Sequence, residues 1–250
     1  MRSREQSQRL DAVEIKFNVD ASGLPAAMEA LELNDAEARH RTIYFFEDLT
    51  GSDGPAGLPL LTNGIILRLR GNNGHRGDVT VKLRPCGGDQ LTRRWLKADK
   101  GDGWSFRVES DWAGPNQTTS ASLEAKIAED AVDAVLMQGS GIPLVPEQGR
   151  FLEDCARVRV DQSQLTPLGP IGGTKWDLTL KGQEIAAEQW VVGDRLRFLE
   201  LSIRVTPEEA PVAQQALEKL LRKCRIDLDS VHETKTRLVM EYLASASSGR

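Results

Sequence analysis

Two short segments of the sequence each carry a pair of cationic side chains at alternate positions. GIILRLRG contributes Arg68 and Arg70, and DVTVKLRP contributes Lys82 and Arg84. Side chains alternate between the two faces of a β-strand, so each pair shares a face while leucine or valine occupies the other. Guanidinium and ammonium groups bind phosphate well. The pattern therefore suits an anion site, although for a single strand a face that simply meets water is the simpler interpretation.

Other segments repeat this alternation of apolar and ionisable faces. VEIKFNV places Glu14 and Lys16 opposite an apolar face, and WSFRVESDW places Arg107 and Glu109 together. In RLRFLELSIRV, Glu200 lies on the polar face. Because several strands share the pattern, it is not an isolated feature of one hairpin.

The composition limits what such a site can be. The 250 residues carry a net charge of −5, which disfavours a general nucleic-acid binder and requires any basic site to be local. No apolar run approaches the ~20 residues of a membrane helix, and the N-terminal segment lacks the apolar centre of a signal peptide. Three distant cysteines favour neither a disulfide framework nor a zinc site. We expect a cytoplasmic protein with neither a nucleic-acid nor a membrane partner; the sequence leaves its oligomeric state open.

Hydrophobic periodicity predicts an α+β chain with about seven or eight strands. A glycine- and asparagine-rich turn joins the two cationic segments into a hairpin. The remaining expected strands cover 13–19, 42–48, 104–112, 174–182, 186–193 and 195–205. Helices are expected over 24–33, 120–137, 146–158 and 207–228, and the final segment, 232–243, fits either helix or strand. We expect one domain over 12–243, with disordered segments at 1–11 and 244–250.

A closed barrel satisfies the needs of both strand faces. In an open sheet the charges could face water, but the apolar faces would still need cover, which the helices can supply. A barrel with charges inside and helices outside meets both demands, and small barrels can hold a ligand. Interior cations repel one another, so the lumen should bind a polyanion. The interior acids could hold a divalent metal that bridges to phosphate oxygens; they are Glu14, Glu109, Glu188 and Glu200.

The order of these segments resembles the CYTH family, the triphosphate tunnel metalloenzymes, from about residue 12 to residue 243. The family strand E-x-E-x-K matches AVEIK, its G-x-x-L-R-x-R strand matches GIILRLR, and its T-x-K-x-R strand matches TVKLR. The pair in the 104–112 segment fits the next family strand. TKT at 234–236, with Lys235, is similar to a late S/T-K element.

The resemblance implies a closed eight-stranded antiparallel tunnel that binds a triphosphate group. Known activities of the family are hydrolysis of tripolyphosphate, hydrolysis of thiamine triphosphate and cyclisation of ATP. One or two divalent ions, Mg²⁺ or Mn²⁺, are expected on the glutamates. Two family carboxylates are replaced here, by Ala12 and Ser202, which puts the second metal and turnover in question.

The resemblance also assigns roles, each with a plainer alternative. The expected phosphate ligands are Lys16, Arg68, Arg70, Lys82, Arg84, Arg107 and Lys235. The expected metal ligands are Glu14, Glu109, Glu188 and Glu200, and the expected catalytic residues are Glu14, Lys16 and Glu200. Singly, each cation could be a solvated surface residue, and each acid could only neutralise the lumen.

Three functions fit these residues. The first is a metal-dependent phosphohydrolase acting on tripolyphosphate or a small organic triphosphate. The second is a non-catalytic module that binds polyphosphate or a nucleotide, since two carboxylates are missing. The third is a class IV-type adenylate cyclase, which ranks below the first because no base-recognition feature can be read from the sequence.

Overall fold

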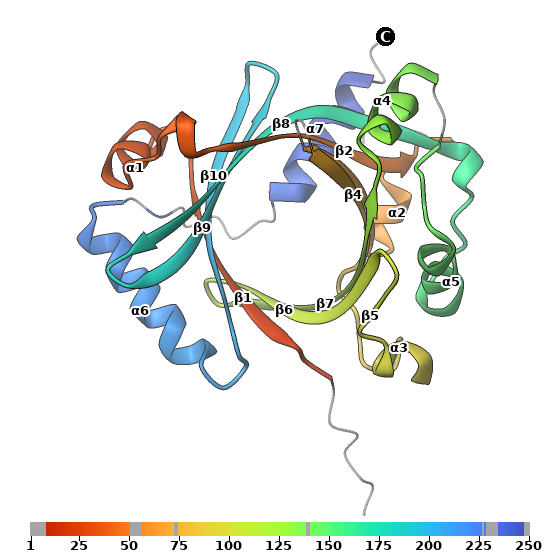
Figure 1. Ribbon diagram of the computed structural model, residues 1–250, viewed down its shortest axis with the longest axis horizontal. Helices are drawn as coiled ribbons and strands as arrows, with labels where there is room; N and C mark the ends of the chain where they lie inside the picture. The colour runs from red at the N-terminus through yellow and green to blue at the C-terminus, as the bar shows by residue number, and fades with distance from the viewer. Residues whose placement is uncertain are drawn as a thin grey trace, which may run out of the picture.

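The computed structural model describes residues 9–50, 57–72, 75–138, 141–226, 228 and 235–247. Its strands form a closed ring (Figure 1), with the order β1-β10-β9-β8-β2-β3-β4-β7-β6 and a parallel pairing of β1 with β6 that closes it. The short β5 (Lys100–Gly101) pairs only with β6. The bounds are β1 Ala12–Val19, β2 Arg39–Asp48, β3 Ile65–Asn72, β4 His75–Leu83, β6 Trp104–Ala113, β7 Asn116–Ile127, β8 Leu165–Leu180, β9 Gln183–Val192 and β10 Leu196–Val205.

The expected closed barrel is confirmed, with a correction in detail. The ring has nine strands rather than eight, and β1 pairs in parallel with β6 while the other neighbours run antiparallel. The parallel closure joins segments about a hundred residues apart in the chain, so local periodicity carries no signal for it.

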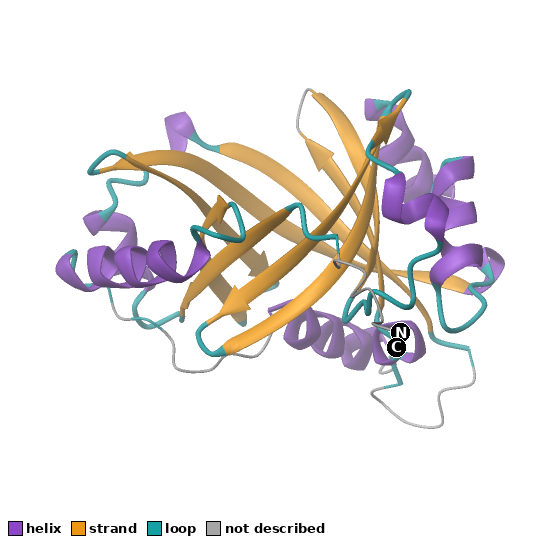
Figure 2. Ribbon diagram, turned by 90° about the horizontal axis from the view of Figure 1, so that it is seen from below, coloured by secondary structure: helices purple, strands orange, loops and turns teal. Residues whose placement is uncertain are grey.

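Helices lie outside the ring on two sides. Figure 1 shows α1 and α6 on one side and α3, α4 and α5 on the other, and Figure 2 shows the strands between these groups. The bounds are α1 Leu24–Ala30, α2 Pro59–Thr62, α3 Arg93–Lys97, α4 Glu129–Gln138, α5 Pro146–Cys155, α6 Ala210–Lys223 and α7 Lys235–Ser247, with short 3₁₀ turns at Asp35–Glu37 and Gln162–Gln164. No described helix is long and apolar enough to cross a membrane.

The apolar faces of the strands point outward, toward these helices. Ile15 of β1 and Leu201 of β10 are fully buried with Leu217 of α6. Around the other half of the ring, Leu67 and Val81 pack in one cluster with α5. Since alternate side chains point the other way, this packing directs the ionisable residues of the same strands into the barrel.

A third apolar cluster lies at one end of the barrel interior. Phe45, Ile66 and Trp190 face inward and pack in the same cluster as Val239 and Met240 of α7. This packing explains why Ile66 breaks the cationic alternation of its strand. The last helix therefore contributes to the core at one end of the barrel.

Most of the predicted elements are confirmed, including the cationic hairpin β3–β4, the strands of the second half, and the helices at α1, α5 and α6. The helix expected over 120–137 is wrong, because β7 runs to Ile127 and only the rest is helical, as α4. Leu123 and Ile127 are spaced four apart, which fits a helix, yet they also lie on one face of a strand. Hydrogen bonding to β4 and β6 decides the outcome.

The segment left open as helix or strand is the helix α7. It runs to Ser247, four residues beyond the expected domain limit of 243, and Asp11, expected in a disordered segment, bonds to β6 through its backbone. The rest of the expected terminal segments, residues 1–8 and 248–250, lies outside the described residues, as does Thr234.

Candidate functional site

The barrel encloses a cavity of about 430 Å³ with a strongly charged lining. Among the described residues, eleven lysines and arginines line it against six carboxylates. The cations are Lys16, Arg41, Arg68, Arg70, Lys82, Arg84, Arg107, Lys126, Lys175, Arg204 and Lys235. The acids are Glu14, Asp78, Glu109, Glu124, Glu188 and Glu200. All eleven residues that the sequence predicts for phosphate, metal or catalysis lie in this lining; their roles stay predictions.

One group of charges is centred on Asp111 of β6, whose side chain is 1% exposed. Lys16 Nζ lies 2.9 Å from Asp111 Oδ1 and 2.9 Å from Glu14 Oε2. Lys82 Nζ donates to Asp111 Oδ2 at 2.9 Å, Arg84 Nε lies 3.5 Å from the same oxygen, and the Ser120 hydroxyl donates to it at 3.3 Å. We call these residues the Asp111 cluster.

The electrostatics of the Asp111 cluster are well compensated. Burial raises the pKa of Asp111, but Lys16, Lys82 and Arg84 outweigh it and hold the pKa far below its ordinary value. Burial lowers the pKa of Lys16, but Glu14 and Asp111 outweigh it and the pKa ends well above the ordinary value. Both groups therefore stay ionised at neutral pH.

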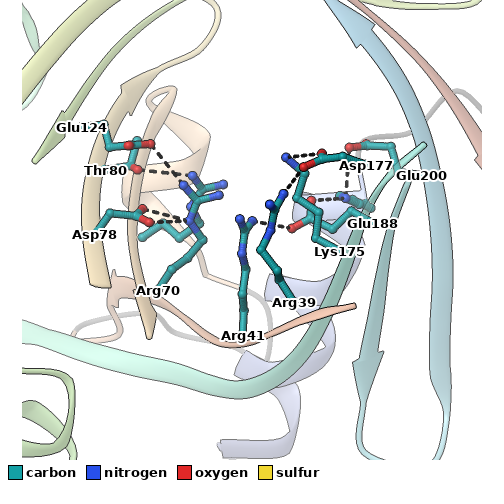
Figure 3. A network of polar contacts seen from close by, with 12 residues as sticks. Arg39, Arg41, Arg70, Asp78, Thr80, Glu124, Lys175, Asp177, Glu188 and Glu200 are labelled. Atoms are coloured by element: carbon teal, nitrogen blue, oxygen red, sulfur yellow. Dashed lines mark hydrogen bonds and ion pairs between the residues drawn. The ribbon is translucent and has the colours of Figure 1, made fainter. Parts of the chain in front are cut away.

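A second group, the Glu188 cluster, joins Glu188 of β9, Glu200 of β10 and Lys235 of α7. Glu188 and Glu200 are direct register partners. Lys235 Nζ lies 3.3 Å from Glu188 Oε2, 3.0 Å from Glu200 Oε1 and 4.2 Å from the centroid of the Trp190 ring. The other oxygen of Glu188, Oε1, is buried with no hydrogen-bond partner among the described residues, and it forms an ion pair with Arg41, whose Nη1 lies 3.6 Å away (Figure 3).

Two neighbouring arginines of β3 differ in their partners. Arg70 Nε donates to Asp78 Oδ1 at 2.8 Å and Arg70 Nη2 donates to Glu124 Oε2 at 3.1 Å, as Figure 3 shows. Among the described residues, Arg68 donates only to the hydroxyl of Thr80, at 3.2 Å, and its Nε is buried without a hydrogen-bond partner. No described carboxylate lies within ion-pair distance of Arg68.

The missing counter-ion shows in the acid–base properties of Arg68. Burial, followed by the neighbouring charge of Arg70, lowers the pKa of Arg68 to about 10. Burial and Arg70 also lower the pKa of Arg41. Both guanidinium groups stay charged at pH 7. Arg41 has a distant counter-ion in Glu188, at 3.6 Å, whereas the charge of Arg68 has no carboxylate partner among the described residues.

The expected metal ligands do not meet at one point. Glu14 is the register partner of Arg204, whereas Glu200 pairs with Asn18, four residues further along β1. This spacing is roughly 13 Å along a strand. Glu109 is paired with Arg204 at 3.0 Å. In the described part of the chain, no group of three or more His, Cys, Asp or Glu side chains could hold a metal.

Several lining or supporting residues were missed by sequence reasoning. They are Arg41, Asp78, Asp111, Glu124, Lys126 and Arg204. A signal for Asp111 was present, because it follows Arg107 and Glu109 at the same alternation. Glu124 and Lys126 had none, since their segment was interpreted as helix. Arg204 shares a face with Glu200 and was visible in the alternation, but its pairing with Glu109 depends on the barrel closure.

Comparison with solved structures supports the architecture. A candidate adenylyl cyclase from Hippeastrum, for which a dominant triphosphatase activity is described, matches over 95% of both chains with a TM-score of 0.59 and 16% identity. A candidate adenylate cyclase from Bacillus halodurans matches over 92% of this chain and 97% of its own, with a TM-score of 0.59 and 12% identity. The likeness confirms the triphosphate-tunnel fold. At these identities it shows the fold alone; no family model matches the chain, and no curated protein matches it.

Within this tunnel fold, the donor sets of the two carboxylate pairs differ in their fit to a divalent ion. Mg²⁺ in proteins usually takes one or two carboxylates and fills the remaining positions with water and phosphate oxygens. Glu188 and Glu200 supply two facing carboxylates, one with an oxygen free of hydrogen bonds. Asp111 Oδ1 also lacks a hydrogen bond among the described residues, but Lys16 Nζ lies 2.9 Å from it and Lys82 Nζ lies 2.9 Å from Oδ2, so cations hold both oxygens closely. The Glu188 cluster is therefore the better fit.

Proposed function

We propose that the chain is a phosphohydrolase that binds the triphosphate group of tripolyphosphate or a small organic triphosphate in its tunnel. The observation that carries this proposal is Arg68, a largely enclosed guanidinium with no carboxylate partner among the described residues. An enclosed charge without a counter-ion is costly, so such a group favours an anionic ligand. Arg68 is the central element of the binding site in this account.

The cations around Arg68 suit a chain of phosphates rather than a single one. Arg68 and Arg70 alternate on β3, Lys82 lies on the adjacent β4, and Arg84 directly follows the end of β4. Same-face residues along a strand lie roughly 7 Å apart. Successive phosphoryl groups can therefore contact successive cations, with the guanidinium groups making paired hydrogen bonds and the lysine acting as a point charge.

The protein's own residues have two further parts in this proposal. Lys16, fixed between Glu14 and Asp111, presents a charge at a constant position and stabilises negative charge that develops in phosphoryl transfer. The lining contains neither histidine nor cysteine among the described residues, so the nucleophile we propose is water. Glu14 and Glu200 keep their proposed catalytic roles as carboxylates that orient the reacting groups.

A divalent ion, Mg²⁺ or Mn²⁺, would be held by Glu188 and Glu200. When bound, it would supply positive charge that neutralises the negative charge of the transferred group. Glu109, which is paired with Arg204, and Glu14, which is paired with Lys16, are less available as ligands. We therefore propose one metal ion rather than two.

The solved neighbours are consistent with a hydrolase and with a cyclase, and do not separate the two. The Hippeastrum protein is described with a dominant triphosphatase activity, and both neighbours are candidate cyclases. The test is a screen for phosphate release and cyclic AMP formation with tripolyphosphate, thiamine triphosphate and ATP, each with Mg²⁺ and with Mn²⁺. Phosphate release that Arg68→Gln abolishes supports the hydrolase. Cyclic AMP from ATP would instead show a cyclase, and binding with no product would show a binding module.

A further inference from the structure

Lys235 is an unusual residue within the Glu188 cluster. It is the first residue of α7, yet it is only 7% exposed and lines the cavity. Among the described residues, the polar partners of its ammonium group are two carboxylates, and it lies above the face of Trp190. A lysine is rarely buried to this extent unless it is paired.

The ammonium group of Lys235 lies between the two negatively charged carboxylates of Glu188 and Glu200. Glu188 and Glu200 lie directly opposite each other on adjacent strands, an arrangement that is unfavourable for two carboxylates by themselves. Lys235 Nζ, at 3.3 and 3.0 Å, offsets that repulsion. A divalent ion bound by the same pair would occupy the same space and would likewise offset the repulsion between the two carboxylates.

We propose that Lys235 is the resident counter-ion of the Glu188–Glu200 pair and keeps divalent ions off it until a triphosphate group draws the ammonium away. The inference rests on the proposed function for its second half, because the anion that competes for Lys235 is the triphosphate. The exclusion of metal by Lys235 in the free protein stands on the contacts alone.

The coupling follows from competition. A bound phosphate chain offers Lys235 a new anionic partner, and movement of a flexible lysine side chain uncovers both carboxylates. Glu188 already has one oxygen without a hydrogen bond. If the triphosphate raises the affinity for metal in this way, metal must raise the affinity for triphosphate by the same factor.

The Asp111 cluster supplies an internal control. Lys16 also bridges two carboxylates, Glu14 and Asp111. Removing that ammonium leaves Asp111 with Lys82, Arg84 and Ser120, so Glu14 is the one carboxylate of this cluster that loses its counter-ion. Removing Lys235 instead leaves two facing carboxylates without their shared cation. Only the Glu188 cluster should therefore acquire a metal ion when its lysine is removed.

The experiment measures Mn²⁺ binding to the ligand-free protein by loss of the electron paramagnetic resonance signal of free aqueous Mn²⁺. Wild type should bind weakly, and Lys235→Gln should bind at least about tenfold more tightly, a change of about 1.4 kcal/mol. The matched control is Lys175→Gln, which removes an equal charge. Lys175 is the register partner of Glu188, but its ammonium group forms an ion pair with Asp177 instead. This variant should stay within about threefold of wild type, as should Lys16→Gln.

A second variant fixes the location of the new site. Lys235→Gln combined with Glu188→Gln should return Mn²⁺ binding to the wild-type level. Circular dichroism and thermal melting show whether each variant is folded, and Lys235→Met replaces Lys235→Gln if the latter is not. Tight Mn²⁺ binding by the free wild type overturns the proposal whatever the variants do. So does a folded Lys235 variant that binds no better than Lys175→Gln.

The two proposals fail separately. If tripolyphosphate does not bind the wild type in the presence of a chelator, the proposed function falls, while a gain of Mn²⁺ binding in the Lys235 variant still supports exclusion by this lysine. If tripolyphosphate binds but the variant gains no metal, the triphosphate site stands and the role assigned to Lys235 is wrong.

Discussion

The Asp111 and Glu188 clusters contain the same components and use them differently. Each has two carboxylates bridged by a lysine inside the barrel. Asp111 has three cations and a hydroxyl around a side chain that is 1% exposed. Asp111 and Glu188 each have one oxygen with no hydrogen bond among the described residues, but Asp111 Oδ1 lies 2.9 Å from Lys16 Nζ, whereas Glu188 Oε1 lies 3.6 Å from Arg41 Nη1. The Glu188 side chain is also 19% exposed. The comparison indicates that a carboxylate closely surrounded by cations, such as Asp111, serves as a structural anchor. A carboxylate with a loosely held oxygen, such as Glu188, can exchange its partner for a ligand.

The bridging lysines also differ in how they are held. Lys16 lies within β1, which is bonded on one side to β10 and on the other to β6. Lys235 begins a helix, and it lines the cavity together with its neighbour Thr236. A lysine in the middle of two-sided strand pairing is fixed by its backbone, whereas one at a helix start can move its ammonium group without disturbing the sheet.

The largest effect that we predict is a loss of stability when the Asp111 cluster is changed. Asp111→Asn should destabilise the protein by about 3–5 kcal/mol, because it leaves Lys16, Lys82 and Arg84 enclosed without their shared counter-ion. Glu188→Gln should cost clearly less, since only Lys235 and the more distant Arg41 depend on that carboxylate. Denaturant unfolding of both variants measures the difference; equal losses would remove the distinction between the two clusters.

The low pKa values of Asp111 and Glu188 predict how the stability of the fold decreases at acid pH. The pKa values of Asp111 and Glu188 lie below those of the unfolded chain, because nearby cations outweigh burial. The folded state therefore binds fewer protons, and the stabilisation is present above the ordinary values of about 4 and is lost as the pH falls through the folded values. Melting temperature measured from pH 6 down to about 2 should fall steeply in wild type and less steeply in Asp111→Asn.

The next prediction concerns Arg68, the enclosed cation that has no carboxylate partner among the described residues. Arg68→Gln should weaken tripolyphosphate binding by about 1.5–3 kcal/mol, the scale of hydrogen bonds to a charged group. The ligand-free variant should melt above wild type, because an uncompensated enclosed charge is gone. Calorimetric titration and a thermal melt measure the two effects. A variant that melts lower and binds as well as wild type would show that Arg68 is structural.

The strand alternation in the sequence was enough to predict which faces are charged. Lys16, Arg68 and Lys82 line the cavity because the alternate side chains are apolar and need the cover of helices. The same reasoning predicted the closed barrel, because a barrel places the charged faces inside and leaves the apolar faces to be covered by helices.

What the sequence could not supply is the pairing of charges across strands. Asp111 meets Lys82 and Lys16 because β6 pairs with β7 and closes on β1. Lys235 meets Glu188 because α7 packs at one end of the barrel. Both contacts join distant parts of the chain, so the expected metal set combined glutamates that the fold separates.

The smallest predicted effect is on a half-exposed cation outside the cavity lining. Arg39 pairs with Asp177, and both side chains are about half exposed, so water screens the pair. Arg39→Gln should weaken tripolyphosphate binding by less than about 1 kcal/mol. It removes the same charge as Arg68→Gln and serves as its matched control in the same titration. Equal losses in the two variants would indicate a general field effect rather than a site at Arg68.

We expect the cations of the tunnel to hold a triphosphate group without help from a metal ion. Isothermal titration of tripolyphosphate into the wild type, with a chelator and at low salt, tests it most directly. We predict one binding site per chain, with an affinity that falls as salt is raised because the contacts are ionic. An absence of binding at millimolar ligand and low salt, in protein shown to be folded, would contradict the account.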